Sequence, residues 1–193
     1  MSLLIHKLPT QVNGIKINTD FRVSILFELL MQDKKVRNDL KIMKALQLYY
    51  PDFENISSIE KAIEQMLWFY RCGKEELANS NTINENKSNK SNKRNQIYSY
   101  EFDDSYIYSA FLQQYTIDLQ EIKYMHWWKF KALFDGLSED TQIVKVMQYR
   151  SVNLAQIKDT ERRNFYKKMK KLYALPDMRT QEEKEREFAE KFL

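Results

Sequence analysis

The sequence predicts a mainly helical protein, a bundle of about six to eight helices with a small N-terminal β-hairpin. Glycine and proline are scarce, with three of each in 193 residues, whereas sandwiches and doubly wound sheets need many tight turns. Apolar residues recur at spacings of three and four along most of the chain, as on the buried face of a helix. One asparagine-, lysine- and serine-rich stretch interrupts this pattern, and we expect it to be a disordered internal loop.

The N-terminal part, residues 1–78, is expected to contain the hairpin and three helices. Asn13-Gly14 lies between apolar residues and favours a two-residue hairpin turn, because both turn positions take a positive φ. Asp20 is placed to cap a helix to about Met31, and a second helix is expected over 33–50. Ser57-Ser58-Ile59-Glu60 is typical of a capping box and opens the third.

Residues 79–97 form the interrupting stretch, which has one aliphatic residue in the seventeen positions 79–95. It cannot bury enough apolar surface to offset the entropy lost on ordering. Four of its residues are cationic and one is a glutamate, so it carries most of the net charge of +4. A basic arm for phosphate is the alternative, but no aromatic residues are interleaved with the cations, and a plain linker is favoured.

Residues 98–175 are expected to pack with the N-terminal part as one domain, and residues 176–193 to form a helical tail. Capping residues and apolar periodicity place four helices in the larger part. They are expected from Asp103 or Asp104 to Gln114, from about Leu119 to Phe134, from Ser138 or Asp140 to about Tyr149, and from about Lys158 to Tyr173.

The helix expected from Leu119 to Phe134 is unusually aromatic and contains two of the three tryptophans. At about 100° per residue, one face carries the expected core positions and the opposite face is also apolar. The core positions are Ile122, His126, Phe130 and Leu133, with Trp127 at their edge. The opposite face contains Tyr124, Met125, Trp128 and Ala132. Either this second face is buried within the domain, or it binds a partner.

The chain offers no catalytic constellation, and we expect a protein that is not an enzyme and has no cofactor or metal. Cys72 is the single cysteine, and His6 and His126 are the only histidines, which is too few ligands for a zinc cluster. His126 is interpreted as a hydrogen-bonded core residue. The adjacent carboxylates Asp103 and Asp104 are interpreted as helix caps. No apolar run approaches the ~20 residues that span a bilayer.

Several strings of residues resemble the bacteriophage gene-product-fifteen proteins. They begin with Thr19-Asp20-Phe21-Arg22 and continue with the block from Tyr98 to Phe111. His126-Trp127-Trp128-Lys129-Phe130 is the most distinctive string. Tyr115, Ile117-Asp118-Leu119, Leu133, Gly136-Leu137, Met147 and Tyr149-Arg150 complete the set. The strings follow one another in family order and cover nearly the whole chain outside residues 79–97.

The resemblance implies a protein of long-tailed phages or prophages of Gram-positive bacteria, encoded in the tail module. Proteins at that position resemble tail assembly chaperones, which are mostly helical, coat the tape-measure protein and leave as the tail-tube protein polymerises. We therefore expect a cytoplasmic protein of the bacterial host that binds the tape-measure protein. The tail-tube protein and a second copy of the chain are further candidate partners, whereas membrane and nucleic acid are not expected.

The candidate client-binding residues are the four on the second face, Tyr124, Met125, Trp128 and Ala132. Two alternatives to a chaperone stay open. One is a structural tail or connector component of the virion. The other, which the sequence favours less, is a nucleic-acid-binding regulator that uses the lysine-rich helix at 158–173.

Overall fold

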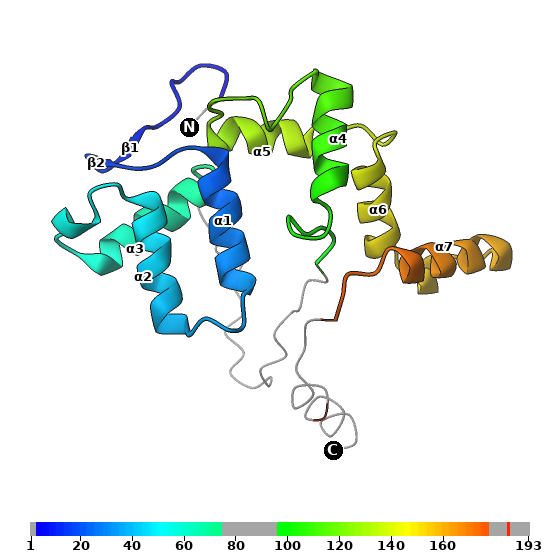
Figure 1. Cartoon of the computed structure of the whole chain (residues 1–193). Coiled ribbons are helices and arrows are strands. Elements are labelled where there is room, and N and C mark those ends of the chain that lie inside the picture. Colours follow the sequence, from blue (N-terminus) through cyan, green and yellow to red (C-terminus); the bar gives the residue numbers. More distant parts are fainter. Residues whose placement is uncertain (1–2, 75–95, 178–184, 186–193) are drawn as a thin grey trace, which may run out of the picture.

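The computed structural model describes residues 3–74, 96–177 and Glu185, and within them the protein is mainly helical with one small hairpin (Figure 1). The strands are β1 (Gln11–Val12) and β2 (Ile15–Lys16). The α-helices are α1 (Phe21–Gln32), α2 (Asn38–Tyr49), α3 (Ile59–Tyr70), α4 (Asp104–Tyr115), α5 (Trp127–Asp135), α6 (Gln142–Ser151) and α7 (Thr160–Leu172). Two short 3₁₀ turns, η1 (Phe53–Asn55) and η2 (Leu154–Gln156), complete the set. The predicted fold class is confirmed.

Two sequence predictions fall mainly outside this range. The interrupting stretch at 79–97 lies outside the described residues except for Gln96 and Ile97. The tail expected over 176–193 lies outside them except for Pro176, Asp177 and Glu185. In the part of the chain that is described, no helix is long and apolar enough to cross a membrane.

The hairpin forms where the Asn-Gly pair predicts it. Asn13 and Gly14 both have a positive φ, at 49° and 82°, and Val12 pairs with Ile15 across the turn. The next residues pass over α2, where the Asn18 backbone N–H donates to the Tyr49 carbonyl at 2.6 Å. The chain then enters α1.

Helices α1, α2 and α3 form the left-hand half of the molecule in Figure 1. Asp20 caps α1 by accepting from the Arg22 N–H at 2.9 Å, as predicted. Helix α3 is capped by Ser58, which accepts from the Lys61 N–H at 3.4 Å, so its cap falls one residue later than the capping box of Ser57 and Glu60 predicts. The helix expected from Asp33 begins only at Asn38. Asp33 instead ends α1, and its carboxylate accepts from the Lys35 N–H at 2.8 Å, which stabilises a turn.

Helix α5 lies between this half and the half formed by α4, α6 and α7 (Figure 1). Its Phe130 ring is fully buried and stacks with Phe21 of α1 at 4.7 Å between ring centroids, and with Phe111 of α4 at 5.0 Å. Aromatic pairs at such distances stabilise beyond their buried area. A continuous aromatic core therefore joins the two halves.

Candidate interaction surface

The aromatic segment does not form the helix that the sequence predicts. Helix α5 begins at Trp127, and the residues from Thr116 to His126 are an irregular loop. Thr116 adopts a left-handed conformation with φ 54°, and Asp118 accepts from the Gln120 N–H at 2.8 Å, which holds a turn. The side chain of Arg22 donates to carbonyls of this loop, including that of Ile122 at 2.7 Å. The expected start at Leu119 is therefore wrong by about two turns.

Both tryptophans of this segment point into the domain. Trp127 donates from its indole Nε1 to the Tyr70 carbonyl at 2.8 Å, and Trp128 donates to the Phe69 carbonyl at 2.7 Å. Only 3% of Trp128 is exposed. Carbonyls in the last turn of a helix lack helical partners, and the two indoles supply donors to the end of α3. The second aromatic face is therefore used inside the domain at Trp128.

The four candidate binding residues separate into two pairs. Met125 and Trp128 are buried, so neither is available to a partner on this surface. Tyr124, which is 53% exposed, and Ala132 remain at the surface. They do not share a helix face, because Tyr124 lies in the loop before α5.

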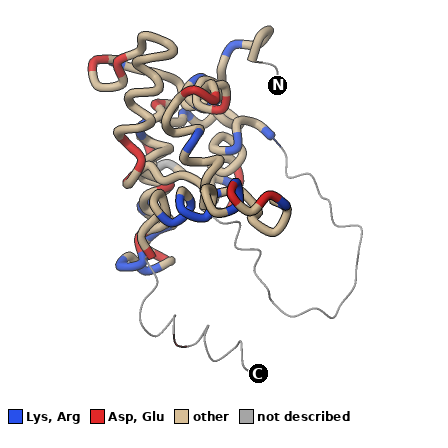
Figure 2. Tube along the Cα trace, turned by 90° about the vertical axis from the view of Figure 1, so that its right-hand side faces the viewer, with Lys and Arg blue, Asp and Glu red and all other residues tan. Residues whose placement is uncertain are grey.

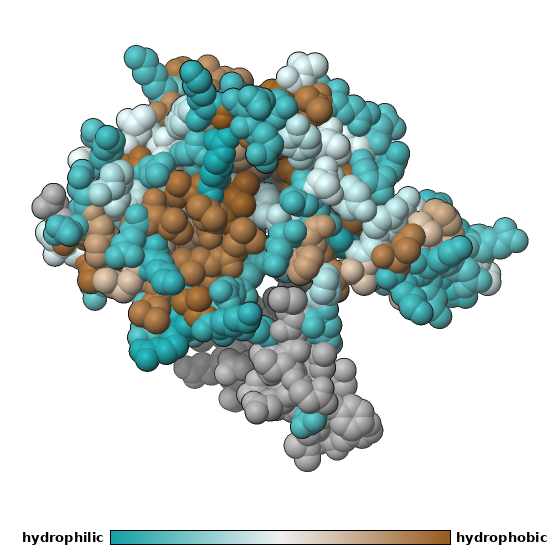
Figure 3. All heavy atoms as spheres, viewed as in Figure 1, coloured by the Kyte–Doolittle hydropathy of each residue, from teal (hydrophilic) through white to brown (hydrophobic). Residues whose placement is uncertain are grey.

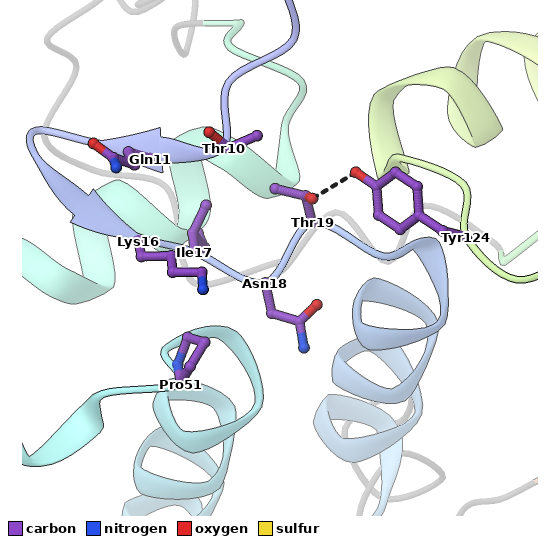
Figure 4. Close-up of a pocket in the computed structure, with 8 residues that line it drawn as sticks. All are labelled: Thr10, Gln11, Lys16, Ile17, Asn18, Thr19, Pro51 and Tyr124. Atoms are coloured by element: carbon purple, nitrogen blue, oxygen red, sulfur yellow. Dashed lines mark hydrogen bonds between the residues drawn. The ribbon is translucent and has the colours of Figure 1, made fainter.

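Tyr124 has a structural contact of its own. Its hydroxyl lies 2.7 Å from the Thr19 Oγ1, and it borders a hollow of about 320 Å³ (Figure 4). The hollow is lined by Thr10, Gln11, Lys16, Ile17, Asn18, Thr19, Pro51 and Tyr124. These side chains are mixed in polarity, and the bond between Thr19 and Tyr124 ties the loop before α5 to the segment between β2 and α1.

His126 is a buried, hydrogen-bonded histidine, as the sequence predicts. It caps α5, because its Nδ1 accepts from the Trp128 backbone N–H at 3.1 Å. Its Nε2 donates to the Pro9 carbonyl at 3.0 Å, which fixes the neutral tautomer. Burial lowers the pKa of His126, and the bond to Pro9 opposes this only in part.

We expect this histidine to make the fold sensitive to mild acid. Its pKa is lowered in the folded state, so as pH falls below about 6.5 the unfolded chain binds the proton first and stability is lost. Protonation also removes the Nδ1 acceptor, and losing such a cap costs about 0.5–2 kcal/mol. Melting temperatures at pH 7.5 and 5.5 check this. The fall should be smaller in His126→Asn, which keeps a capping acceptor; equal falls in both proteins would contradict it.

Of the paired carboxylates, Asp104 lies in the first turn of α4 and accepts from the Ser105 N–H at 2.6 Å, as the sequence suggests, whereas Asp103 does not act as a cap. Asp103 stands at the N-cap of α4 but makes no capping hydrogen bond with its side chain. It is buried and forms a two-bond ion pair with Arg150 of α6, at 2.5 and 2.9 Å. Its carboxylate also accepts from the Ser99 N–H at 2.9 Å. The prediction that Asp103 is a simple cap is therefore wrong, because a cation 47 positions away in the sequence binds it.

A contiguous apolar surface lies on α1 and α2. Figure 3 shows it as a brown area over these two helices, in the view of Figure 1. We define the α1–α2 face by the residues around a shallow hollow of about 330 Å³, which are Leu26, Leu30, Lys44, Gln47 and Leu48. Leu26 is 50% exposed, and Leu30 and Leu48 are half-buried. Three leucines thus share a concave surface that no described residue covers.

The apolar surface continues across α1. Ile25 of α1 lines a second hollow, of about 290 Å³, with residues of α4 and α5. Exposed apolar residues also extend along α2, at Leu40 and Met43. Exposed apolar patches of this kind mark interaction sites on soluble proteins. The sequence could have indicated this surface, because eight of the twelve residues of α1 are apolar. A helix that is apolar all round is buried or contacts a partner.

Among the described residues, no group of three or more histidine, cysteine, aspartate or glutamate side chains is placed to hold a metal ion.

The fold and the surface together define a mainly helical protein with an aromatic core and an exposed apolar face. A family model described as "Bacteriophage Gp15 protein" matches residues 3–175, and the chain belongs to that bacteriophage family. No curated protein and no solved structure matches the chain.

The strings that carry the family resemblance have structural tasks in this fold. Asp20 caps α1, Phe21 stacks on Phe130, and Arg22 anchors the loop before α5. Asp103 and Arg150, from two different strings, bind each other. These residues build the domain and do not line the α1–α2 face.

Proposed function

We propose that this phage protein is a non-enzymatic, tail assembly chaperone-like protein that binds the tape-measure protein in the host cytoplasm during long-tail morphogenesis. The observation that carries the proposal is the α1–α2 face, a concave apolar surface on a protein of a bacteriophage family. Amphipathic helices bind such surfaces by laying their apolar side into the hollow. A tape-measure protein is expected to present long helices of this kind.

The shape and chemistry of the face suit a client of variable sequence. Its apolar contacts come from leucines rather than from a deep pocket, so different apolar side chains can occupy it. A single contact of this size gives weak binding, and many copies along one long client supply avidity. The two buried tryptophans take no part, because they are needed in the core.

The proposal is tested by producing the tape-measure protein of the same phage with and without this chain. We expect the tape-measure protein to be soluble and to co-purify only when the chain is present. Mass spectrometry of purified virions then separates the chaperone from a structural tail component, because a chaperone is absent from the finished particle. Unchanged solubility together with the chain's presence in virions would favour the structural role.

We expect Leu26→Ser combined with Leu48→Ser to weaken tape-measure binding by roughly tenfold or more, because each buried leucine contributes about 1.5–3 kcal/mol. Folding should be little affected, since both side chains are already partly in water. Binding is measured by co-purification yield and by titration with a soluble tape-measure fragment.

The matched control is Leu112→Ser, which changes another exposed leucine, on α4 and outside the α1–α2 face. It should leave binding unchanged. Equal losses in the control and in the double variant would place the client site elsewhere.

A further inference from the structure

The chain before the hairpin carries an apolar segment that projects from the molecule. We define the N-terminal arm as the segment Leu3-Leu4-Ile5-His6-Lys7. Its three apolar residues are 47%, 94% and 82% exposed, in chain order. Figure 2 shows the chain next to the N mark standing out from the body. Burying these side chains against a partner would be favourable, and exposed apolar groups of this kind mark interaction sites.

The base of the arm is fixed to the domain. The Pro9 carbonyl accepts from the His126 Nε2 at 3.0 Å, and Leu8 is half-buried against the hydrophobic core. The apolar residues of the arm therefore lie three to five positions before a fixed point. A segment that is held at one end loses less conformational freedom on binding than a free tail does.

A hollow with matching chemistry lies between α1, α4 and the loop before α5. Its volume is about 290 Å³, and we call it the α1–α4 hollow. Its apolar lining comes from Phe21, Ile25, Ile107, Leu119 and Phe130. An apolar cavity of roughly 150 Å³ is enough for a benzene-sized group, so this hollow has room for aliphatic side chains of the arm.

The unpaired charges of the arm and of the hollow have opposite signs. Lys7 is exposed, and so is Asp104, which lines the hollow. Neither forms an ion pair with any residue that the structure describes. The cation at the same hollow, Arg22, already binds Asp20 and two carbonyls of the loop before α5. The charge that the hollow offers to a partner is therefore negative.

We propose that the N-terminal arm of one copy of the chain binds the α1–α4 hollow of a second copy. The apolar side chains of the arm enter the hollow, and Lys7 pairs with Asp104 of the other copy. Lys7 lies two residues after Ile5, which is at most about 7 Å along the chain. Its long side chain therefore reaches a carboxylate at the edge of the hollow that Ile5 enters.

The contact joins two different surfaces of the same chain. In a pair of copies one arm and one hollow stay unoccupied, so the contact repeats from copy to copy. No residue of the α1–α2 face lines the α1–α4 hollow. The inference therefore does not depend on the proposed client site.

Other occupants fit less well. A membrane requires a broad apolar face, and the arm offers three apolar residues. A second copy supplies both the positive arm and the negative hollow. The arm of the same chain is the nearest rival, because it would make the same contacts without any increase in mass.

The first test measures the mass of the full chain by sedimentation over a range of concentrations. We expect association with a Kd on the order of 100 μM, because the contact is smaller than a standard interface. Leu4→Ser with Ile5→Ser should weaken association roughly tenfold or more. The matched control is Ile59→Ser with Leu172→Ser, which changes an exposed isoleucine and an exposed leucine elsewhere. It should associate as the original chain does.

The second test reverses the charges at the contact. Lys7→Asp alone and Asp104→Lys alone should each weaken association several-fold, because each places like charges together. Both changes in one chain restore opposite charges between copies, and association should return toward that of the original chain. Lys167→Asp changes an exposed lysine on α7 and is the matched control. Circular dichroism confirms that each variant is folded.

Cross-linking identifies which copy supplies each residue. Unlabelled and isotopically labelled chains are mixed, treated with a carbodiimide that joins amines to carboxylates, and digested for mass spectrometry. We expect Lys7 to be joined to Asp104 in peptide pairs that combine a labelled with an unlabelled partner.

The proposal fails if the chain stays monomeric over the whole range, or if the arm variant associates as the original chain does. It also fails if the double charge variant associates no better than the single ones. Cross-links within single copies alone would show that the arm binds its own chain instead. Tape-measure binding is measured separately at the α1–α2 face, so failure here is distinguishable from failure of the chaperone role.

Discussion

Replacing Arg150 by methionine is expected to destabilise the fold by about 3–5 kcal/mol, because it leaves the buried carboxylate of Asp103 without its cation. Only 1% of the Asp103 side chain is exposed. Water therefore cannot take over the role of the guanidinium. A loss of this size is a large part of the stability of an ordinary domain.

Arg150 also organises the chain around it. Its Nε donates to the Tyr173 carbonyl at 2.6 Å, just beyond the end of α7, and one Nη donates to the Ile97 carbonyl at 3.1 Å. The same guanidinium thus links α6 to the segment before α4 and to the end of α7. Its removal should loosen the α6–α7 side first, which hydrogen exchange would show as faster exchange in α7 than in α1.

Urea unfolding followed by circular dichroism measures the loss. The matched control is Arg37→Met, which breaks an ion pair with Asp39 at the surface, where the midpoint should not move. Replacing Asp103 and Arg150 together by leucine and methionine should recover part of the loss, because no buried charge is then left alone. A midpoint that Arg150→Met leaves unchanged would show that the pair is not buried in solution.

The sequence predicted the local features of this fold because their causes lie within a few residues. The Asn13-Gly14 turn and the Asp20 cap depend on adjacent backbone groups, and both occur. A serine also caps α3, one residue later than the predicted capping box places it. The start of α5 was misplaced because residues 116–126 carry helical apolar spacing and contain no glycine or proline. Contacts that hold them as a loop come in part from Arg22 and Thr19, about 100 positions earlier, which periodicity cannot reveal.

The candidate site was harder to predict than the fold. Aromatic enrichment marks cores and interfaces alike, so composition could not decide where Trp128 points. The direction in which Trp128 points depends on the end of α3, because carbonyls there accept hydrogen bonds from the indoles of both Trp127 and Trp128. The α1–α2 face was open to prediction from the uniform apolarity of α1, but α2 shows no comparable signal. Its contribution through Leu48 and Lys44 depends on how the two helices pack.

The second large effect is expected at Trp128, where substitution by alanine should cost about 3–5 kcal/mol of folding free energy. The indole lies against Phe69 at 5.9 Å and against Trp68 at 5.5 Å between ring centroids. It also approaches the backbone at Gly73, where an added Cβ would lie 2.8 Å from the Trp128 Cη2. Alanine would therefore open a cavity between α3 and α5.

Trp128→Phe separates the packing of this side chain from its hydrogen bond. Phenylalanine keeps much of the apolar volume but cannot donate to the Phe69 carbonyl, so it should cost about 1–3 kcal/mol. Trp68→Phe is the control, because Trp68 is only half-buried and should change stability less. Thermal and urea unfolding measure all three variants.

The same variants distinguish a core residue from a partner-binding residue. A core Trp128 predicts that tape-measure binding falls only as far as the folded fraction falls, so binding per folded molecule stays constant. If Trp128→Ala instead kept its unfolding midpoint and lost binding, the indole would be exposed to the partner in solution. Each outcome lowers one of the two measurements and leaves the other unchanged. A single protein preparation, assayed for unfolding and for binding, therefore decides whether this aromatic segment belongs to the domain or to its interface.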